Sequence, residues 1–404
     1  MFRYLIGLLF LMAIVGVAYY FLGMQSATSP ELAKKMEPLI IGFVGPLSGN
    51  AASYGASIKN SVSLAIKDLK TQGKPVDVIY EDGRCDSQSA VEALKRLIDK
   101  GIKIVIGGVC SGETLAMAPI AEENRIILFS PAAASPDITN AGTFVFRNNP
   151  SDAYGGKVLS DFLSKKHKEV AIIFENADYP KVLRNIFIEN FTEKGGRITL
   201  DEAFTSDAKE FTQIISKVKN ATTVEAIVIN PQTEQLAGQL VKDIRGAKID
   251  LPIYGHLLPG GDRFLEVAGK AAEGLIFTDV PSLNESNVRV STFLEDYRKN
   301  FGQPVMEFYM GAAYDAVNLL VQAVERIGSD QLRVKDYLYN LPEFDGLLGK
   351  YSFDLNGDVL SINLVLKIIK EGRVVNYEET EVIENSTSTL ENSTSTATTT
   401  QKSI

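Results

Sequence analysis

The stretch Leu39-Ile-Ile-Gly-Phe-Val44 decides the fold class, because a short apolar run of this kind predicts a strand buried on both faces. The run Ile102-Lys-Ile-Val-Ile-Gly107 has the same character. Between the two, the spacing of apolar residues predicts a helix over 58–69, a strand over 76–80 and a helix over 87–100. Strands that alternate with helices over short connections indicate a parallel sheet covered by helices on both faces.

The alternation continues to a strand over 126–130 and restarts after residues 147–150, so two doubly wound α/β sheets are expected. Further strands are predicted at 169–174, 197–204, 226–229, 252–254 and 274–277, and further helices at 114–124, 154–165, 181–194 and 211–219. A third block adds helices at 291–301 and 311–327 and a closing strand at 363–369.

Two such sheets that face each other form a cleft, and ligands of open α/β sheets bind beyond the carboxyl ends of the strands. The segments that follow predicted strands are 45–55, 108–113, 130–136, 175–181, 230–234 and 255–260. We therefore expect the binding residues of this protein to come from these segments.

The two ends of the chain have different compositions. Residues 4–24 carry no charge and follow Arg3, so residues 1–30 are predicted to be a membrane anchor that leaves the remainder outside the cytoplasm. The length favours an uncleaved helix, and removal as a signal peptide stays open as the alternative. Residues 381–404 are rich in Ser and Thr and are predicted to be a disordered tail.

The composition argues against several function classes. A net charge of −9 is unsuited to a nucleic-acid partner, since a phosphate backbone requires a basic surface. Two histidines and two cysteines make a histidine- or cysteine-rich metal site improbable. No nucleotide-binding glycine motif and no hydrolase elbow occur, so we expect no cofactor and no catalytic set. Residues 354–358 have the look of a calcium loop but lack its glutamate, which favours a turn.

Cys85 and Cys110 each follow a predicted strand of the first sheet. In a chain exported from the cytoplasm, two cysteines are expected to form a disulfide. A pair of free thiols in a redox site is the alternative, and the absence of Cys-x-x-Cys spacing weighs against it.

Several of these segments resemble the periplasmic leucine/isoleucine/valine-binding proteins. The opening residues 41–49 (IGFVGPLSG) and 52–55 (ASYG) are similar to the start of that family. Further segments in family order are 82–86, 107–112, 129–136, 178–179, 271–274, 314–317 and 353–358. The resemblance covers about residues 38–380.

The resemblance implies a type I periplasmic-binding fold, with two discontinuous lobes joined by a three-crossover hinge. The first lobe then comprises 38–150 and 282–350, and the second comprises 151–281 and 351–380. The family delivers branched-chain or related amino acids to an ABC importer, so a permease and an ATPase are the implied partners. The alternative is a receptor ectodomain that senses a ligand without transporting it.

The resemblance also implies roles for individual residues. Ser111, which follows the second cysteine, matches the serine that binds the ligand carboxylate, and Gly112 permits close approach of the backbone. The small residues Ala132, Ala133 and Ala134 match a strand end that offers a carbonyl and a hydroxyl to the ligand amine. Because Ala134 has no hydroxyl, that contact is missing unless Ser135 replaces it.

Both lobes contribute further matches. Tyr54 and Tyr179 correspond to aromatic residues that cover the ligand from opposite lobes, although either could be an ordinary half-buried tyrosine. Thr233 lies near a ligand contact of the second lobe, and His256 faces the cleft or is a buried turn histidine.

Leu257 is the main departure, because an acidic residue that pairs with the ligand ammonium is expected there. A buried ammonium without a carboxylate costs several kcal/mol. Either Glu234 or Asp279 compensates, or the ligand is not an α-amino acid.

Overall fold

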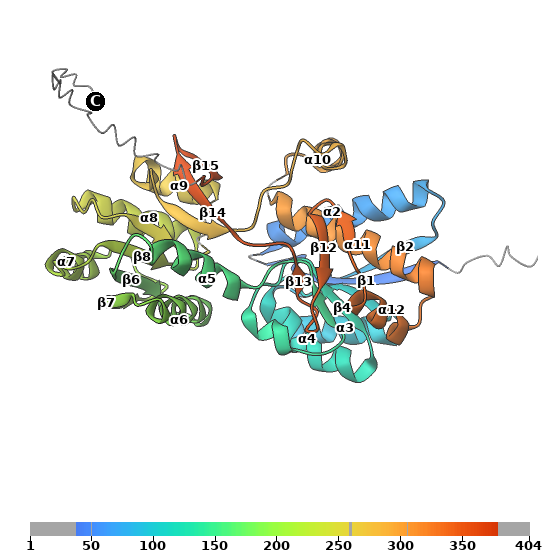
Figure 1. Cartoon of the computed structure of the whole chain (residues 1–404). Helices are drawn as coiled ribbons and strands as arrows, with labels where there is room; N and C mark the ends of the chain where they lie inside the picture. The colour runs from blue at the N-terminus through green and yellow to red at the C-terminus, as the bar shows by residue number, and fades with distance from the viewer. Residues whose placement is uncertain (1–37, 50, 258–260, 305, 379–404) are drawn as a thin grey trace, which may run out of the picture.

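The computed structural model describes residues 38–49, 51–257, 261–304 and 306–378 of the 404-residue chain. They form two lobes that lie side by side and are joined by extended segments (Figure 1). The predicted anchor within 1–30 and the predicted tail at 381–404 lie outside the described residues. Among the described helices, none is long and apolar enough to cross a membrane.

The first lobe is built on a five-stranded parallel sheet in the order β2-β1-β3-β4-β5. Its strands are β1 (Leu39–Gly45), β2 (Val76–Asp82), β3 (Ile104–Gly107), β4 (Ile127–Ser130) and β5 (Val145–Arg147). Side chains alternate across a strand, so Phe43 and Phe129 enter the core on one face, and Val44 and Leu128 enter the core on the other. Burial of a side chain as large as Phe43 contributes about 1.5–3 kcal/mol.

Helices cover both faces of this sheet. On the Phe43 face lie α2 (Ala52–Thr71), α11 (Glu307–Ile327) and α12 (Gln331–Tyr339), and on the Val44 face lie α3 (Ser87–Asp99) and α4 (Ser111–Asn124). Helix α10 (Val288–Phe301) packs beside α2 and α11. The predicted strand–helix alternation is thus confirmed for this lobe.

The second lobe contains a seven-stranded sheet in the order β15-β14-β10-β9-β8-β6-β7. Its strands are β6 (Glu169–Glu175), β7 (Arg197–Phe204), β8 (Ala226–Asn230), β9 (Ile253–Gly255), β10 (Ile276–Asp279), β14 (Val365–Lys370) and β15 (Arg373–Asn376). Helices α5 (Asp152–Leu163) and α6 (Asp178–Glu193) cover one face, and α7 (Thr212–Asn220), α8 (Glu234–Gly246) and α9 (Asp262–Ala268) cover the other.

Strands β14 and β15 depart from the predicted parallel pattern. Strand β10 runs toward the first lobe, and β14 returns from it, so the two pair antiparallel. The chain then reverses at Glu371 and Gly372, both with positive φ, which suits a two-residue hairpin turn, and β15 pairs antiparallel with β14.

In the described part of the chain, three segments connect the lobes: 148–151 between β5 and α5, 280–287 between β10 and α10, and 361–364 between β13 and β14. We call the first of these segments, which Figure 1 places between the lobes, the first crossover. Lobes joined in this way can rotate about the connecting segments.

The boundary predicted at residue 351 is displaced in the structure. Strands β11 (Phe344–Gly346), β12 (Gly349–Phe353) and β13 (Val359–Leu360) form a small antiparallel sheet, and Tyr351 and Phe353 belong to the first lobe's core. The ring of Phe353 lies 5.7 Å from those of both Phe129 and Phe146. Residues 351–360 therefore stay with the first lobe, because their aromatic side chains are buried there.

Periodicity alone does not predict α8, α9 and α12, nor the short strands β5, β11, β13 and β15. Strands of two to four residues carry too few apolar positions to form a pattern. Helix α12 lies in a polar stretch, and its start is marked only by Asp330, whose side chain accepts a hydrogen bond from the N–H of Arg333.

Candidate functional site

A cleft of about 1040 Å³ lies between the lobes. The first lobe lines it with Tyr54, Ala134 and residues 306–309, and a connecting segment adds residues 280–282. The second lobe lines it with Asp152 at the start of α5 and with Tyr179, Pro231, Gln232, Glu234, Leu257, Gly261, Asp262, Leu265, Asp279, Lys367 and residues 372–374. Two other hollows in the described residues, of about 840 and 630 Å³, lie on the first lobe alone. Of these three hollows, the cleft is the one that both lobes line, as the sequence predicts for a binding site.

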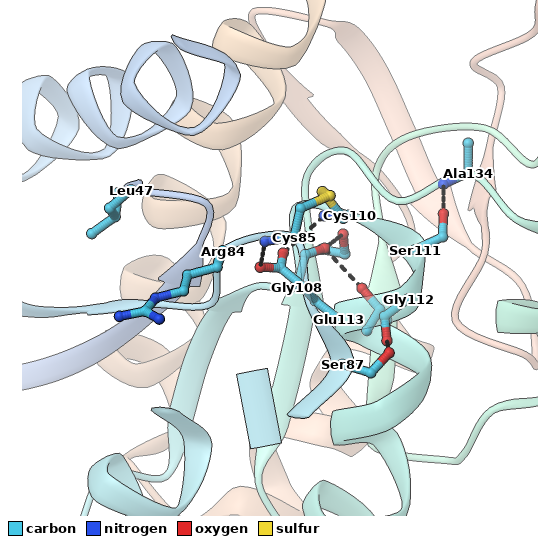
Figure 2. The surroundings of a disulfide bond; sticks show 12 residues. Leu47, Arg84, Cys85, Ser87, Gly108, Cys110, Ser111, Gly112, Glu113 and Ala134 are labelled. Atoms are coloured by element: carbon cyan, nitrogen blue, oxygen red, sulfur yellow. Dashed lines mark hydrogen bonds between the residues drawn. A yellow bond between two sulfur atoms is a disulfide. The ribbon is translucent and has the colours of Figure 1, made fainter. Parts of the chain in front are cut away.

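Ser111 is the first residue of α4 and lies directly behind Ala134. Its hydroxyl oxygen accepts a hydrogen bond from the backbone N–H of Ala134 at 3.2 Å (Figure 2) and a second from that of Ser135, also at 3.2 Å. A serine hydroxyl has two lone pairs and one proton, so two accepted bonds leave its O–H free to donate. Since it stands at the positive end of a helix, Ser111 is suited to bind an anion.

The disulfide between Cys85 and Cys110 confirms the predicted pairing, with the two Cα atoms 5.4 Å apart. Glu113, a fully buried residue of α4, accepts hydrogen bonds from the N–H groups of Cys85 at 2.9 Å and Cys110 at 3.0 Å (Figure 2). Burial raises the pKa of Glu113. The disulfide and this carboxyl group fix the turn before α4, and with it the position of Ser111.

Tyr54 lies in the first turn of α2 and lines the cleft from the first lobe. Its neighbour Gly55 lies so near the loop after β1 that an added Cβ would be 1.9 Å from the carbonyl oxygen of Pro46. Only glycine permits this close approach of the backbone. Gly55 therefore allows the start of α2, and with it the Tyr54 ring, to lie at the cleft wall. The ring meets that of Tyr309 edge to face at 5.7 Å, so the first lobe presents a paired aromatic wall.

Asp152 is a cleft residue that the motif comparison missed. Its side chain is 3% exposed, and one carboxyl oxygen accepts a 2.7 Å hydrogen bond from the hydroxyl of Tyr179. Burial raises the pKa of Asp152 to about 7, although the Tyr179 bond and the charge of Arg147 act in the opposite direction. The position of Ser151-Asp152 at the start of α5, directly after the first crossover, was the available signal.

Ala134 connects Ser111 to Asp152. Its N–H donates to the Ser111 hydroxyl, and its carbonyl accepts a 2.9 Å bond from the N–H of Asp152. A hydroxyl that can donate and a carboxyl group that can accept are thus held on either side of one residue. This arrangement suits a ligand that carries an acidic and a basic group on one carbon atom.

Leu257 lines the cleft where an acidic residue was expected. Its backbone has a φ of +52°, uncommon for a leucine, and its N–H donates to the Thr278 hydroxyl at 2.9 Å. The side chain packs against the apolar core of the first lobe. Leu257 therefore contributes apolar surface and backbone strain to the cleft, and no charge.

Asp279 and Glu234, which could replace the carboxylate expected at position 257, already have hydrogen-bond partners. Asp279 forms a 2.8 Å ion pair with Lys367, whose side chain is 11% exposed. Glu234 accepts a 2.9 Å hydrogen bond from the N–H of Arg263. Among the described residues, the carboxyl groups of Asp152 and Glu234 each accept one hydrogen bond, but Asp152 is buried beside Ala134, so it is the better placed of the three to receive a cation.

Some predicted residues do not line the cleft directly, and Ser111, behind Ala134, is one of them. Ala132 and Ala133 are buried beneath it, and the carbonyl of Gly112 accepts a hydrogen bond from the Ser87 hydroxyl on the disulfide side. Thr233 caps α8 by accepting a bond from the N–H of Leu236. These positions support the site from behind or at its edge.

His256 is enclosed rather than exposed to the cleft. It is 1% exposed, and its Nδ1 lies 3.0 Å from the carbonyl oxygen of Leu183. Burial lowers its pKa to about 4, so it is neutral at ordinary pH. The reading as a satisfied buried histidine holds. No cluster of three or more potential metal ligands occurs among the described residues.

Comparisons with known proteins place these features in context. The family model described as "Periplasmic binding protein" matches residues 38–363. The leucine-, isoleucine-, valine-, threonine- and alanine-binding protein of Pseudomonas aeruginosa is 25% identical over 355 residues, which cover 86% of this chain and 94% of that protein.

Two solved structures are also similar. A leucine-binding protein from Thermotoga maritima is 28% identical, with a TM-score of 0.71 over 84% of this chain and 98% of the other. The branched-chain amino acid transporter substrate-binding protein of Streptococcus pneumoniae, solved with isoleucine, is 26% identical, with a TM-score of 0.70 over the same shares. The sequence-based expectation of the leucine/isoleucine/valine-binding family is confirmed.

Proposed function

Because the chain belongs to the periplasmic binding protein family, a group of solute-binding proteins, we propose that it captures a small α-amino acid in the cleft between its lobes. The branched-chain binding relatives make leucine, isoleucine and valine the first candidates. The captured ligand would then pass to an ABC permease and its ATPase outside the cytoplasm.

One observation carries the proposal: Ser111 and Asp152 flank Ala134 and offer opposite chemistry. The Ser111 hydroxyl and the start of α4 suit a carboxylate. The carboxyl group of Asp152 suits an ammonium, whose charge would favour its ionised form. The two charged groups of an α-amino acid stand on one carbon and could reach both partners.

The side chain of the ligand would meet the apolar and aromatic wall. Tyr54 and Tyr309 form this wall on the first lobe, and Leu257 and Leu265 line it on the second. Burial of a branched aliphatic side chain against such residues contributes about 1.5–3 kcal/mol. A hydrophobic amino acid therefore fits the cleft better than an acidic one.

The test compares three molecules that share the isobutyl group of leucine. Titration calorimetry of the full chain with L-leucine should give binding, whereas 3-methylbutylamine lacks the carboxylate and 4-methyl-2-oxopentanoate lacks the ammonium. We expect leucine to bind at least about tenfold more tightly than either analogue, because each analogue leaves one charged partner unused. Equal affinity for leucine and the amine would refute a carboxylate site at Ser111.

The apolar Leu257 and the pairing of Asp279 with Lys367 favour a second candidate, a carboxylate ligand without an ammonium. In that case a protonated Asp152 would donate a hydrogen bond to the ligand. The same titrations separate the candidates, since tighter binding of 4-methyl-2-oxopentanoate than of leucine would select the second.

We further propose that residues 1–30 tether the protein to the cytoplasmic membrane. Support comes from the uncharged stretch at 4–24 and from the periplasmic description of the family. Intact-mass measurement of the mature protein should give the full 404-residue chain. A mass that lacks the first 25–30 residues would indicate a cleaved signal instead.

A further inference from the structure

The N–H groups of the loop at residues 131–135, which we call the ligand loop, donate to the hydroxyls of Ser130 and Ser111, and its carbonyls are held by a different segment. Its backbone carbonyls accept three hydrogen bonds from the segment around the first crossover. Arg147 donates to Ser135 at 2.8 Å, the Asn149 side chain donates to Ala132 at 2.9 Å, and the N–H of Asp152 donates to Ala134 at 2.9 Å. The shape of the ligand loop therefore depends on residues 147–152.

Arg147 is the most unusual of these residues because its guanidinium is 0% exposed. Its Nε and Nη2 donate to the two carboxylate oxygens of Asp358 at 2.6 and 3.0 Å. Nη2 also donates to the Thr139 hydroxyl at 3.0 Å, and that hydroxyl donates to Asp358 at 2.7 Å. One side chain thus joins the ligand loop and Thr139 to a turn that lies 211 positions away in the sequence.

The place of these partners in the chain is informative. Arg147 ends β5 just before the first crossover, and Asp358 lies just before the crossover at 361–364. Asp358 is also fixed by its own turn, where its N–H donates to the carboxyl group of Asp354 at 2.9 Å. The turn at 354–358 is therefore an anchor for Arg147.

A buried ion pair contributes little net stability compared with apolar side chains of the same volume, because removing both charges from water is costly. A planar guanidinium can hold several acceptors in fixed directions, which a lysine cannot. The arrangement is therefore better suited to fix geometry than to increase stability. The geometry that it fixes is that of Ser135, whose N–H donates to the Ser111 hydroxyl.

We propose that Arg147 and Asp358 are positioning residues, which hold the ligand loop against Ser111 so that the carboxylate site is preformed before the ligand arrives. The proposal rests on the proposed function for its ligand-binding part alone. It predicts that weakening the Arg147–Asp358–Thr139 cluster loosens the amides of Ala134 and Ser135 in the ligand-free protein.

The experiment uses the full chain with the variants Arg147→Lys, Asp358→Asn and Thr139→Val. Arg147→Lys keeps the charge but cannot reach Asp358, Ser135 and Thr139 together, and Thr139→Val keeps the ion pair intact. Asp315→Asn is the matched control, since Asp315 is a buried carboxyl of the same lobe that accepts from the N–H groups of Leu347 and Leu348.

Two quantities are measured: hydrogen–deuterium exchange of peptides spanning 131–140 without ligand, and the dissociation constant for L-leucine. We expect exchange at Ala134 and Ser135 to rise about tenfold in Arg147→Lys and Asp358→Asn, and less in Thr139→Val. Leucine binding should weaken by about tenfold in the first two variants. The Asp315→Asn control should instead raise exchange at Leu347 and Leu348.

Unchanged exchange at 131–140 in Arg147→Lys and Asp358→Asn would overturn the proposal. So would an equal rise there in Asp315→Asn, because the effect would then be general loosening of the lobe. If the unmodified chain does not bind leucine, the proposed ligand is wrong, and the exchange data still decide the positioning role.

Discussion

The two ends of the cleft are built by different means. The end at Ser111 belongs to the first lobe alone, where a disulfide, the buried Glu113 and the start of α4 fix it from behind. The end at Asp152 lies at the start of the second lobe, where the carboxyl group depends on one hydroxyl, that of Tyr179. Tyr179 is 37% exposed.

The difference indicates the order of the two binding steps, with the ligand carboxylate bound before the ammonium. A carboxylate can bind to a preformed donor set on one lobe, which requires little reorganisation. The ligand ammonium meets the carboxyl group of Asp152, whose pKa is raised to about 7 by burial. Asp152 is therefore fully ionised only when the positive charge of the ligand is next to it. Binding at the second end is therefore expected to depend more on charge and on lobe closure.

The largest effect is expected from Asp152→Asn, which removes the proposed partner of the ammonium. Leucine affinity should fall more than about 100-fold, because a buried ammonium without its carboxylate costs about 3–5 kcal/mol. Calorimetry checks the value, with Asp161→Asn on the exposed side of α5 as the control. Affinity within threefold of the unmodified chain would place the ammonium elsewhere.

Ser111→Ala should weaken leucine binding by about 10- to 150-fold. The change removes a hydrogen bond to a charged group worth about 1.5–3 kcal/mol and leaves the Ala134 and Ser135 amides without their acceptor. Ser87→Ala is the matched control, since its hydroxyl bonds only to the Gly112 carbonyl. A loss no greater than that of the control would argue against the carboxylate site.

The affinity for leucine should fall by about tenfold between pH 8 and pH 6, because the ammonium requires ionised Asp152, whose pKa is about 7. The stability effect has the opposite sign. A carboxyl group with a raised pKa holds its proton more tightly in the folded chain, so its contribution is present at low pH and is lost as the pH rises through about 7.

Titrations across this pH range check the binding effect, and melting curves of the ligand-free chain check the stability effect. Asp152→Asn serves as the reference in both, since other titrating groups are common to the two proteins. A pH profile that is the same in both proteins would remove Asp152 from the ligand's charge balance.

The smallest effect is expected from Leu257→Glu, which restores an acidic residue where one was expected. Leucine should gain about three- to tenfold over 4-methyl-2-oxopentanoate, since an extra carboxylate favours an ammonium but the site already holds Asp152. Leu257→Gln controls for shape. If the ratio of the two dissociation constants does not change, residue 257 faces the ligand's side chain rather than its amine.

Much of the site could be predicted from the order of its motifs. Ser111, Tyr54, Tyr179 and Leu257 were predicted from the resemblance to the leucine/isoleucine/valine-binding family, and each also lies in a segment that follows a predicted strand, where ligands of open α/β sheets bind. Asp152 was not predicted because it lies outside every matched motif, and its position directly after the first crossover was the one signal available. Tyr309 lies within a long helix, where periodicity indicates burial rather than contact with a ligand.

The alternation of strands and helices and the presence of two lobes could be read from the sequence, because they follow from local apolar patterns. The pairing of Cys85 with Cys110 could be read from it as well, because an exported chain with two cysteines has one possible pair. Only the tertiary structure decided that residues 351–360 stay with the first lobe, that β14 and β15 run antiparallel, and that Arg147 meets Asp358. Those outcomes depend on contacts between segments distant in the sequence, such as the 211 positions between Arg147 and Asp358, which local patterns do not encode.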